Sequence, residues 1–215
     1  MKKISFILLA LLCWSSMVSA QENNNRLRKK YRNLSFVKQE FEPASYFGMD
    51  QTLKSNFGAA FTVGRTFYLH KKPIAGLIRF DLNYTNYKLE YRWEDNYDEE
   101  EEPETSNFHQ AEIGMQVGPS VTVNPVGKLN VNAYFRFAPS FSALYDDDTL
   151  LGNYASYFVT GGGISYGVIG LGVESRWGSC KFKSFGGGDS EEDEQEPEPG
   201  KSKFNGMRVY LSFRF

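Results

Sequence analysis

Few side chains in this sequence could carry out catalysis or bind a metal. Two histidines and two cysteines are the whole complement of the side chains best suited to both tasks. Ser106, His109 and Glu112 contain the groups of a nucleophile, base and acid set. In a strand, however, His109 would point away from the other two, because alternate residues face opposite sides. Cys180 is far in sequence from either histidine, so no metal-ligand spacing appears. We therefore expect no catalytic, cofactor-binding or metal site, and no enzymatic activity.

The N-terminus has the features of a secretory signal peptide. A basic start at residues 1–3 precedes an apolar run from Ile4 to Trp14, and Val18-Ser19-Ala20 supplies small residues at a cleavage site. We therefore expect residues 1–20 to be removed on export and residues 21–33 to form a basic periplasmic tail. Cys180 is then the only mature cysteine, so no intrachain disulfide can form. The formal net charge of -2 argues against a nucleic-acid partner.

Hydrophobicity in the rest of the chain alternates with a period of two. At the C-terminus, Val209, Leu211, Phe213 and Phe215 alternate with polar or amphipathic residues, and residues 128–141 show the same pattern. The uncharged stretch 149–173 contains too many glycines for a helix and fits two strands around a turn near Gly167. The clean segments run about ten residues, the length of a tilted strand that crosses a bilayer. We expect strands at about 34–47, 57–69, 73–94, 108–123, 128–143, 154–166, 169–182 and 206–215, with a bulge near Thr85.

The connections between these strands alternate in length. Turns at residues 70–73, 124–127 and 166–170 are short, whereas those at 95–107, 146–153 and 184–205 are long. Clusters of eight, three and seven carboxylates, 18 of the 26 in the chain, lie in or beside the long connections. An outer-membrane barrel has this asymmetry, with short periplasmic turns and long extracellular loops. The sequence therefore predicts an all-β fold, an up-and-down antiparallel transmembrane β-barrel of about eight strands spanning residues 34–215.

With its signal peptide, alternating last strand and terminal Phe215, the chain resembles the small outer-membrane β-barrels of Gram-negative bacteria. The resemblance covers the mature chain in architecture, and its sharpest motif is the C-terminal Arg208-Val-Tyr-Leu-Ser-Phe-Arg-Phe215. In that family the aromatic end of the last strand is part of the signal read by the barrel assembly machinery, which here implies Phe213 and Phe215. The resemblance implies location in the cell outer membrane, with outer-membrane lipid and that machinery as partners. Because the family includes adhesins, pores and lipid enzymes, it does not determine function.

The polar faces of the expected strands would project into a lumen just wide enough to be filled by side chains. Charges of both signs lie on these faces, and we expect them to pair. The predicted lumen charge cluster is Arg79, Asp81, Glu112, Arg136, Glu174, Arg176, Arg208 and Arg214.

This pattern favours a closed, non-enzymatic barrel with a structural or surface-interaction role, whose acidic loops bind divalent cations weakly. The alternatives are a small pore for polar solutes and a soluble exported ligand-binding barrel with its apolar faces inside.

Overall fold

In the computed structural model, the residues described are 28–42, 53–55, 57–72, 74, 78–94, 108–146, 149–184 and 201–215. The expected signal peptide, residues 1–20, and the segment 95–107 lie outside them, as does most of the connection before the last strand. In these residues the strands are β1 (Lys30–Glu42), β2 (Leu53–Lys54), β3 (Phe57–Tyr68), β4 (Ile78–Glu94), β5 (Phe108–Val123), β6 (Leu129–Asp146), β7 (Thr149–Tyr166), β8 (Ile169–Cys180), β9 (Lys183–Ser184) and β10 (Ser202–Arg214).

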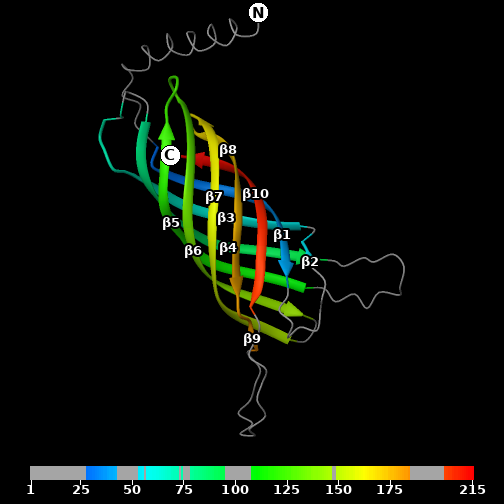
Figure 1. Ribbon diagram of the computed structural model, residues 1–215. Coiled ribbons are helices and arrows are strands. Elements are labelled where there is room, and N and C mark those ends of the chain that lie inside the picture. Colours follow the sequence, from blue (N-terminus) through cyan, green and yellow to red (C-terminus); the bar gives the residue numbers. More distant parts are fainter. Residues whose placement is uncertain are drawn as a thin grey trace, which may run out of the picture.

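Eight long strands in the described chain form one closed antiparallel sheet (Figure 1). Each pairs with the next along the chain, and β1 pairs with both β3 and β10. The seam between β1 and β10 runs without a break from Tyr31 opposite Arg214 to Glu42 opposite Lys203. The two-residue strands β2 and β9 extend β1 and β7 at one end. The expected up-and-down barrel is confirmed.

Short turns gather at the end of the barrel that holds the C-terminus. Gly127 and Gly167 have φ angles of 50° and 62° in the turns before β6 and β8, a conformation that glycine adopts without strain. At the same end the amide of Phe215 donates to the carbonyl of Lys30 at 3.0 Å. The turn expected near Gly167 is therefore present, and the two ends of the described barrel adjoin.

Several strand boundaries differ from those expected. β1 begins at Lys30 rather than 34, so part of the expected basic tail is strand. The expected continuation of this strand from 43 to 47 lies outside the described residues. β6 and β7 extend to Asp146 and Thr149, which leaves only residues 147–148 in place of the long connection 146–153. β10 also begins four residues early, at Ser202. In each case cross-strand pairing extends through polar residues that a pattern of alternation does not recognise as strand.

The expected irregularity in the longest strand is a bulge in β4. Phe61 pairs with Leu89 and Thr62 with Tyr87, so Lys88 is the extra residue. It lies three positions after Thr85, the point at which the apolar pattern slips. An extra residue exchanges the two faces of a strand beyond it, which explains why the alternation in this segment changes parity.

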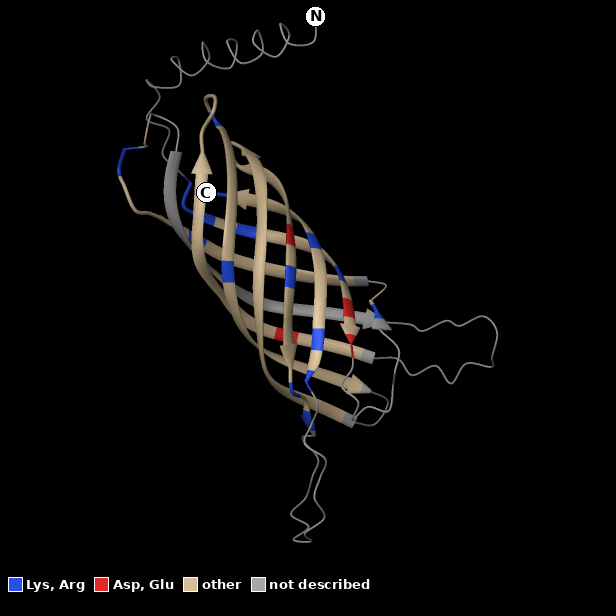
Figure 2. Ribbon diagram, viewed as in Figure 1, with Lys and Arg blue, Asp and Glu red and all other residues tan. Residues whose placement is uncertain are grey.

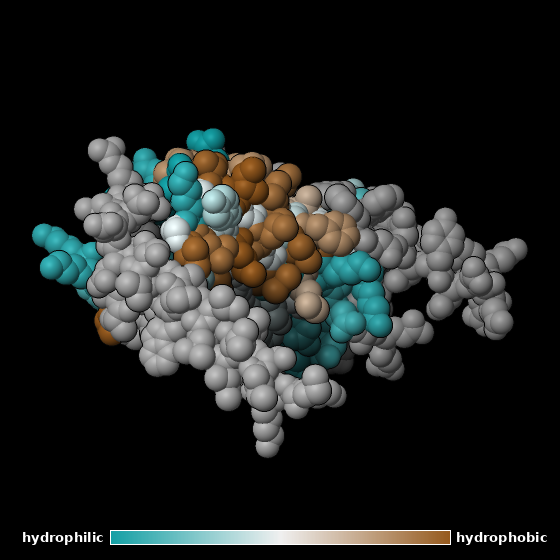
Figure 3. Space-filling model, turned by 90° about the horizontal axis from the view of Figure 1, so that it is seen from above, coloured by the Kyte–Doolittle hydropathy of each residue, from teal (hydrophilic) through white to brown (hydrophobic). Residues whose placement is uncertain are grey.

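The barrel wall is apolar outside and polar inside over most of its height. Leu171 and Ile113 are 62% and 55% exposed, whereas their neighbours in sequence, Gly172 and Glu112, are buried. Figure 3 shows part of the exterior as a continuous brown area bordered by teal residues. This is the polarity of a protein whose solvent is lipid, and it contradicts the alternative of a soluble barrel with its apolar faces inside. In the described residues no helix is long and apolar enough to cross a membrane.

Candidate functional site

The lumen is the candidate site, because it is where the strands bring charged side chains together. Period-two alternation turns Glu112 of β5, Arg136 of β6, Glu174 and Arg176 of β8, and Arg208 of β10 inward, and all five are buried. Their strands lie up to about 100 positions apart in the sequence, and closure of the sheet brings them within reach of one another. Five of the eight predicted lumen charges thus lie in the barrel interior.

The first ion pair crosses the lumen. Arg176 donates through one terminal nitrogen to the carboxylate of Glu112, and both side chains are almost fully buried. β5 and β8 are separated around the wall by two strands, so the contact spans the interior and does not follow the sheet. The Arg176 guanidinium also stacks on the ring of Tyr157, with its carbon 3.5 Å from the ring centroid. The contact therefore joins two separate parts of the barrel wall through the lumen.

A second ion pair lies one layer nearer the short turns. Arg208 donates to Glu174 at 3.3 Å, and the Tyr134 hydroxyl donates to the other oxygen of the same carboxylate at 2.7 Å. Tyr210 then lies 3.3 Å from the Tyr134 hydroxyl, and donates to the carbonyl of Gly162 at the same distance. Glu174 therefore joins β8, β10, β6 and β7 across the interior.

The partners of the Arg136 guanidinium are uncharged polar groups and an aromatic ring, not a carboxylate. It donates to Gln116 at 2.9 Å and to the Thr85 hydroxyl at 3.2 Å, and its guanidinium lies 3.6 Å from the centroid of the Tyr134 ring. The Tyr31 hydroxyl bonds to the same Thr85 hydroxyl. Of this network, Gln116 and Arg136 were expected on the inner face, whereas Tyr31 was expected in the basic tail. Which of these residues meet depends on the stagger of the strands, which the sequence does not state.

Glycines in the wall make room for the tyrosine rings of the lumen. A Cβ added at Gly172 would lie 2.2 Å from a ring carbon of Tyr210, and one at Gly64 would lie 2.3 Å from the ring of Tyr31. The hydroxyl ends of these rings thus lie against backbone that carries no side chain. The glycine-rich stretch 149–173, besides being a poor helix, is the surface on which part of the lumen is packed.

An aromatic layer fills the lumen at the long-connection end. Phe41 packs against Phe204 and Phe182, with ring centroids 4.9 and 6.3 Å apart, and Tyr157 packs against Phe204 at 5.9 Å. The outer faces of the same segments are charged: Glu40 and Glu42 flank Phe41, and Lys203 precedes Phe204. On β1 and β10 the wall is therefore apolar inside and polar outside at this end. This is the reverse of the polarity of the wall nearer the short turns.

The remaining predicted residues have other surroundings. Arg214 is half-buried, with its guanidinium 5.6 Å from the centroid of the Tyr31 ring at the short-turn end. Arg79 and Asp81 pair through their backbone with Thr122 and Ser120, and their side chains lie outside the described residues. Phe213 and Phe215 are on the outer face, 40% and 48% exposed. The position of the proposed assembly signal on the lipid-facing side is thus as the alternation predicted.

Two members of the best catalytic candidate in the sequence, His109 and Glu112, lie within the described residues and face opposite sides of the wall. Glu112 points inward to Arg176, whereas His109 lies on the opposite face of β5, as parity requires. Ser106 lies outside the described residues. Within the described segments no group of three or more His, Cys, Asp and Glu side chains could hold a metal ion.

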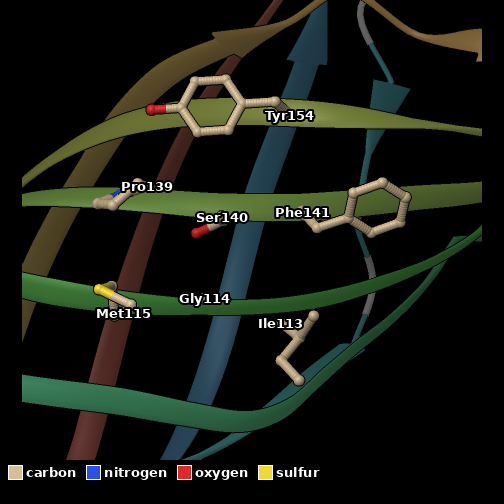
Figure 4. Close-up of a pocket in the computed structure, with 7 residues that line it drawn as sticks. All are labelled: Ile113, Gly114, Met115, Pro139, Ser140, Phe141 and Tyr154. Carbon is tan, nitrogen blue, oxygen red and sulfur yellow. The ribbon is translucent and has the colours of Figure 1, made fainter.

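A groove of about 320 Å³ runs along the outer wall where β5, β6 and β7 meet (Figure 4). It is lined by Ile113, Gly114, Met115, Pro139, Ser140, Phe141 and Tyr154. Pro139 has no amide proton to give to the ladder. The Ser140 hydroxyl is buried behind it and donates to the carbonyl of Ala138 at 3.4 Å. The groove faces the same surroundings as the rest of the apolar wall and offers no reactive group.

Comparisons with known proteins give structural likeness only. No protein-family model and no curated protein matches the chain. Among solved structures, Neisserial surface protein A matches at 12% identity and a TM-score of 0.45, over 86% of this chain and 97% of that one. Ail of Yersinia pestis, in complex with a heparin analogue, matches at 5% and 0.46, over 87% and 98%. The outer-membrane protease OmpT of Escherichia coli matches at 10% and 0.44, over 91% and 100%.

At these values we infer no activity from the likeness. The fold and the site define the class of protein by themselves. A closed antiparallel barrel with an apolar exterior, a polar packed interior and short turns at one end is an integral barrel of an outer membrane.

Proposed function

We propose that this protein is a closed, non-enzymatic outer-membrane barrel that acts as a structural element or through its outer surface. The observation that carries the proposal is that two layers of side chains occupy the lumen at different heights. Two buried ion pairs and Arg136 occupy its middle, and the aromatic layer around Phe204 occupies the end nearer the long connections. An ion would have to pass both layers.

The two layers oppose permeation in different ways. The Arg176–Glu112 pair fixes side chains across the lumen, and the Arg208–Glu174 pair joins neighbouring strands inside it. Separating either pair leaves charges in a medium of low polarity, which is costly. The aromatic layer consists mainly of phenylalanine rings, which cannot replace the hydration shell of an ion. A polar solute therefore meets a steric obstacle at one level and a desolvation barrier at the next.

Single-channel recording tests the closed state. Refolded protein in a planar bilayer should give no stable current, whereas a known porin in the same bilayer should conduct. Insertion is checked on the same sample by electrophoresis, since an intact barrel migrates differently before and after heating. Stable steps of current from the folded protein would refute a closed lumen and favour the alternative of a small pore for polar solutes.

The outer surface is where partners would bind. The acidic segments 95–107 and 185–200 follow β4 and precede β10, on the side opposite the short turns. We propose that they bind Ca²⁺ or Mg²⁺ weakly, because clustered carboxylates suit hard divalent cations and the sequence of these segments lacks the ligand spacing of a preorganised calcium loop. Calorimetric titration of the folded barrel with Ca²⁺, with and without residues 94–104, should show loss of heat in the deletion. Equal heats would refute binding at that segment.

A further inference from the structure

Three basic residues lie together on the outer wall at the short-turn end. Lys30 and Arg32 are successive outward residues of β1, and Arg65 is outward on β3. Lys30 is directly opposite Arg65, and Arg32 is directly opposite Val63, one outward position along. All three side chains are exposed. Figure 2 shows Lys and Arg, in blue, at this end of the barrel near the C-terminus.

The side chains beside this cluster are apolar and aromatic. Val63 and Phe67 precede and follow Arg65 on the same face of β3, so Arg65 lies within the apolar surface. Its guanidinium is 5.1 Å from the centroid of the Phe67 ring, and that of Arg32 is 5.2 Å from the centroid of the Phe215 ring. Stacking of this kind fixes where the charges lie, but an aromatic ring does not neutralise a cation.

No acidic residue of the described chain pairs with the three cations. Two exposed lysines at the other end are paired: Lys203 with Glu42 at 3.4 Å and Lys54 with Glu40 at 3.6 Å. Like charges directly opposite each other on neighbouring strands destabilise a sheet. Three cations on an apolar wall, two of them directly opposite, therefore favour binding of an anion that the described residues do not supply.

We propose that Lys30, Arg32 and Arg65 bind the phosphate of one anionic phospholipid, with its acyl chains against the apolar wall on the Val63 side of Arg65. The ligand is a phospholipid with a net negative charge and no cationic group in its headgroup, such as phosphatidylglycerol. Guanidinium groups suit this ligand because they present paired donors to phosphate oxygens. The assignment to the periplasmic leaflet rests on the proposed orientation, in which the short turns face the periplasm.

The position of the cluster favours a lipid over free phosphate. The cations are on the lipid-facing side of the wall and not in the lumen, and Phe67, the next outward residue, is 44% exposed. A headgroup at the level of Arg65 would place its acyl chains along the apolar face toward Val63. Lysine and arginine near a membrane surface each favour anionic lipid modestly, and three such residues together make a site.

The test is native mass spectrometry of the folded barrel in mixed micelles, titrated with phosphatidylglycerol or with phosphatidylcholine of the same chain length. We expect one phosphatidylglycerol to bind preferentially, and R32Q/R65Q to bind it about 30-fold more weakly. The matched control is K72Q/K128Q, which removes two exposed charges at the same end but away from β1 and β3. Its affinity should stay within about twofold of the wild type. Inorganic phosphate at equal concentration should not displace the lipid.

Three outcomes would overturn the proposal. The first is equal affinity of the wild type for the two lipids, which needs no variant. The second is an equal loss in R32Q/R65Q and K72Q/K128Q, which would indicate a general effect of net charge. The third is displacement by inorganic phosphate, which would reassign the site to a free anion. Each result is separate from failure of the closed-barrel proposal, because single-channel current and lipid affinity are independent measurements.

Discussion

Glu174 offers the sharpest test of the interior, because one carboxylate has two partners at known distances. Arg208 donates to one oxygen at 3.3 Å and Tyr134 to the other at 2.7 Å. Glu174→Gln keeps the size of the side chain and an acceptor for Tyr134, but leaves Arg208 without its counter-charge. Glu174→Ala removes the contacts with both partners at once.

The magnitudes follow from burial. The side chains of Arg208 and Glu174 are 1% and 7% exposed, so solvent cannot take the place of the lost partner. Breaking such a pair costs about 3–5 kcal/mol. We expect Glu174→Gln to lower the free energy of unfolding by about 3 kcal/mol, and Glu174→Ala by about 1 kcal/mol more through the lost hydrogen bond. The double variant E174M/R208M, with both charges replaced by apolar side chains, should return to within about 2 kcal/mol of the wild type.

The assay is urea unfolding of the barrel in lipid vesicles, with the folded fraction read by electrophoresis of unheated samples. Ser175→Ala is the control, since its side chain is next along β8 and exposed on the opposite face; it should change stability by less than about 0.5 kcal/mol. A loss below about 1 kcal/mol in Glu174→Gln would refute the argument from charge burial. A double variant less stable than either single variant would also refute it.

Three further predictions concern the wall and the assembly of the barrel. Val209→Lys, in the middle of the apolar face of β10, should destabilise the barrel by about 2–4 kcal/mol in vesicle unfolding, whereas Asn205→Lys on the same face beyond the apolar belt should cost less than about 1; equal effects would contradict the position of the belt. Gly172→Ala should cost about 1–3 kcal/mol, because its Cβ would lie 2.2 Å from the Tyr210 ring, and a neutral result in the same assay would show that the ring is not held there. Deleting Phe215 should lower the amount of barrel in outer-membrane fractions several-fold without affecting export. This loss is expected if Phe215 belongs to the signal for the assembly machinery. Unchanged levels in those fractions would refute that role.

Alternation was enough to predict the barrel because lipid and lumen impose opposite polarity on successive residues. The prediction was least accurate where that contrast fails. β1 carries outward cations at its start and Lys38, Glu40 and Glu42 toward its end, so only its middle reads as membrane strand. Residues 146–153 combine carboxylates, glycine and asparagine, which are typical of loops, yet pairing between β6 and β7 continues through all but 147–148.

The sequence predicted which residues face the lumen, but it did not predict which of them contact one another. Parity placed Glu112, Glu174 and Arg208 in the lumen, but which charges meet depends on the stagger of strands that are distant in sequence. Arg176 reaches across to Glu112, whereas Arg208 pairs with Glu174 on the neighbouring strand. The aromatic layer around Phe204 was not predicted, because its residues alternate on segments whose outer faces are charged, the pattern of an ordinary soluble strand.

The adjoining ends of the barrel have a consequence for how its sequence could be rearranged. Lys30 and Phe215 exchange backbone hydrogen bonds, so a short peptide could join them without disturbing the seam. New termini could then be opened between β4 and β5, where no strand pairing of the described chain would be cut. Such a circular permutant would keep every register but bury the terminal aromatic residue within a continuous chain. In the permutant Phe215 would keep its place on the outer wall but would no longer be the last residue. The importance of these two properties could then be measured separately.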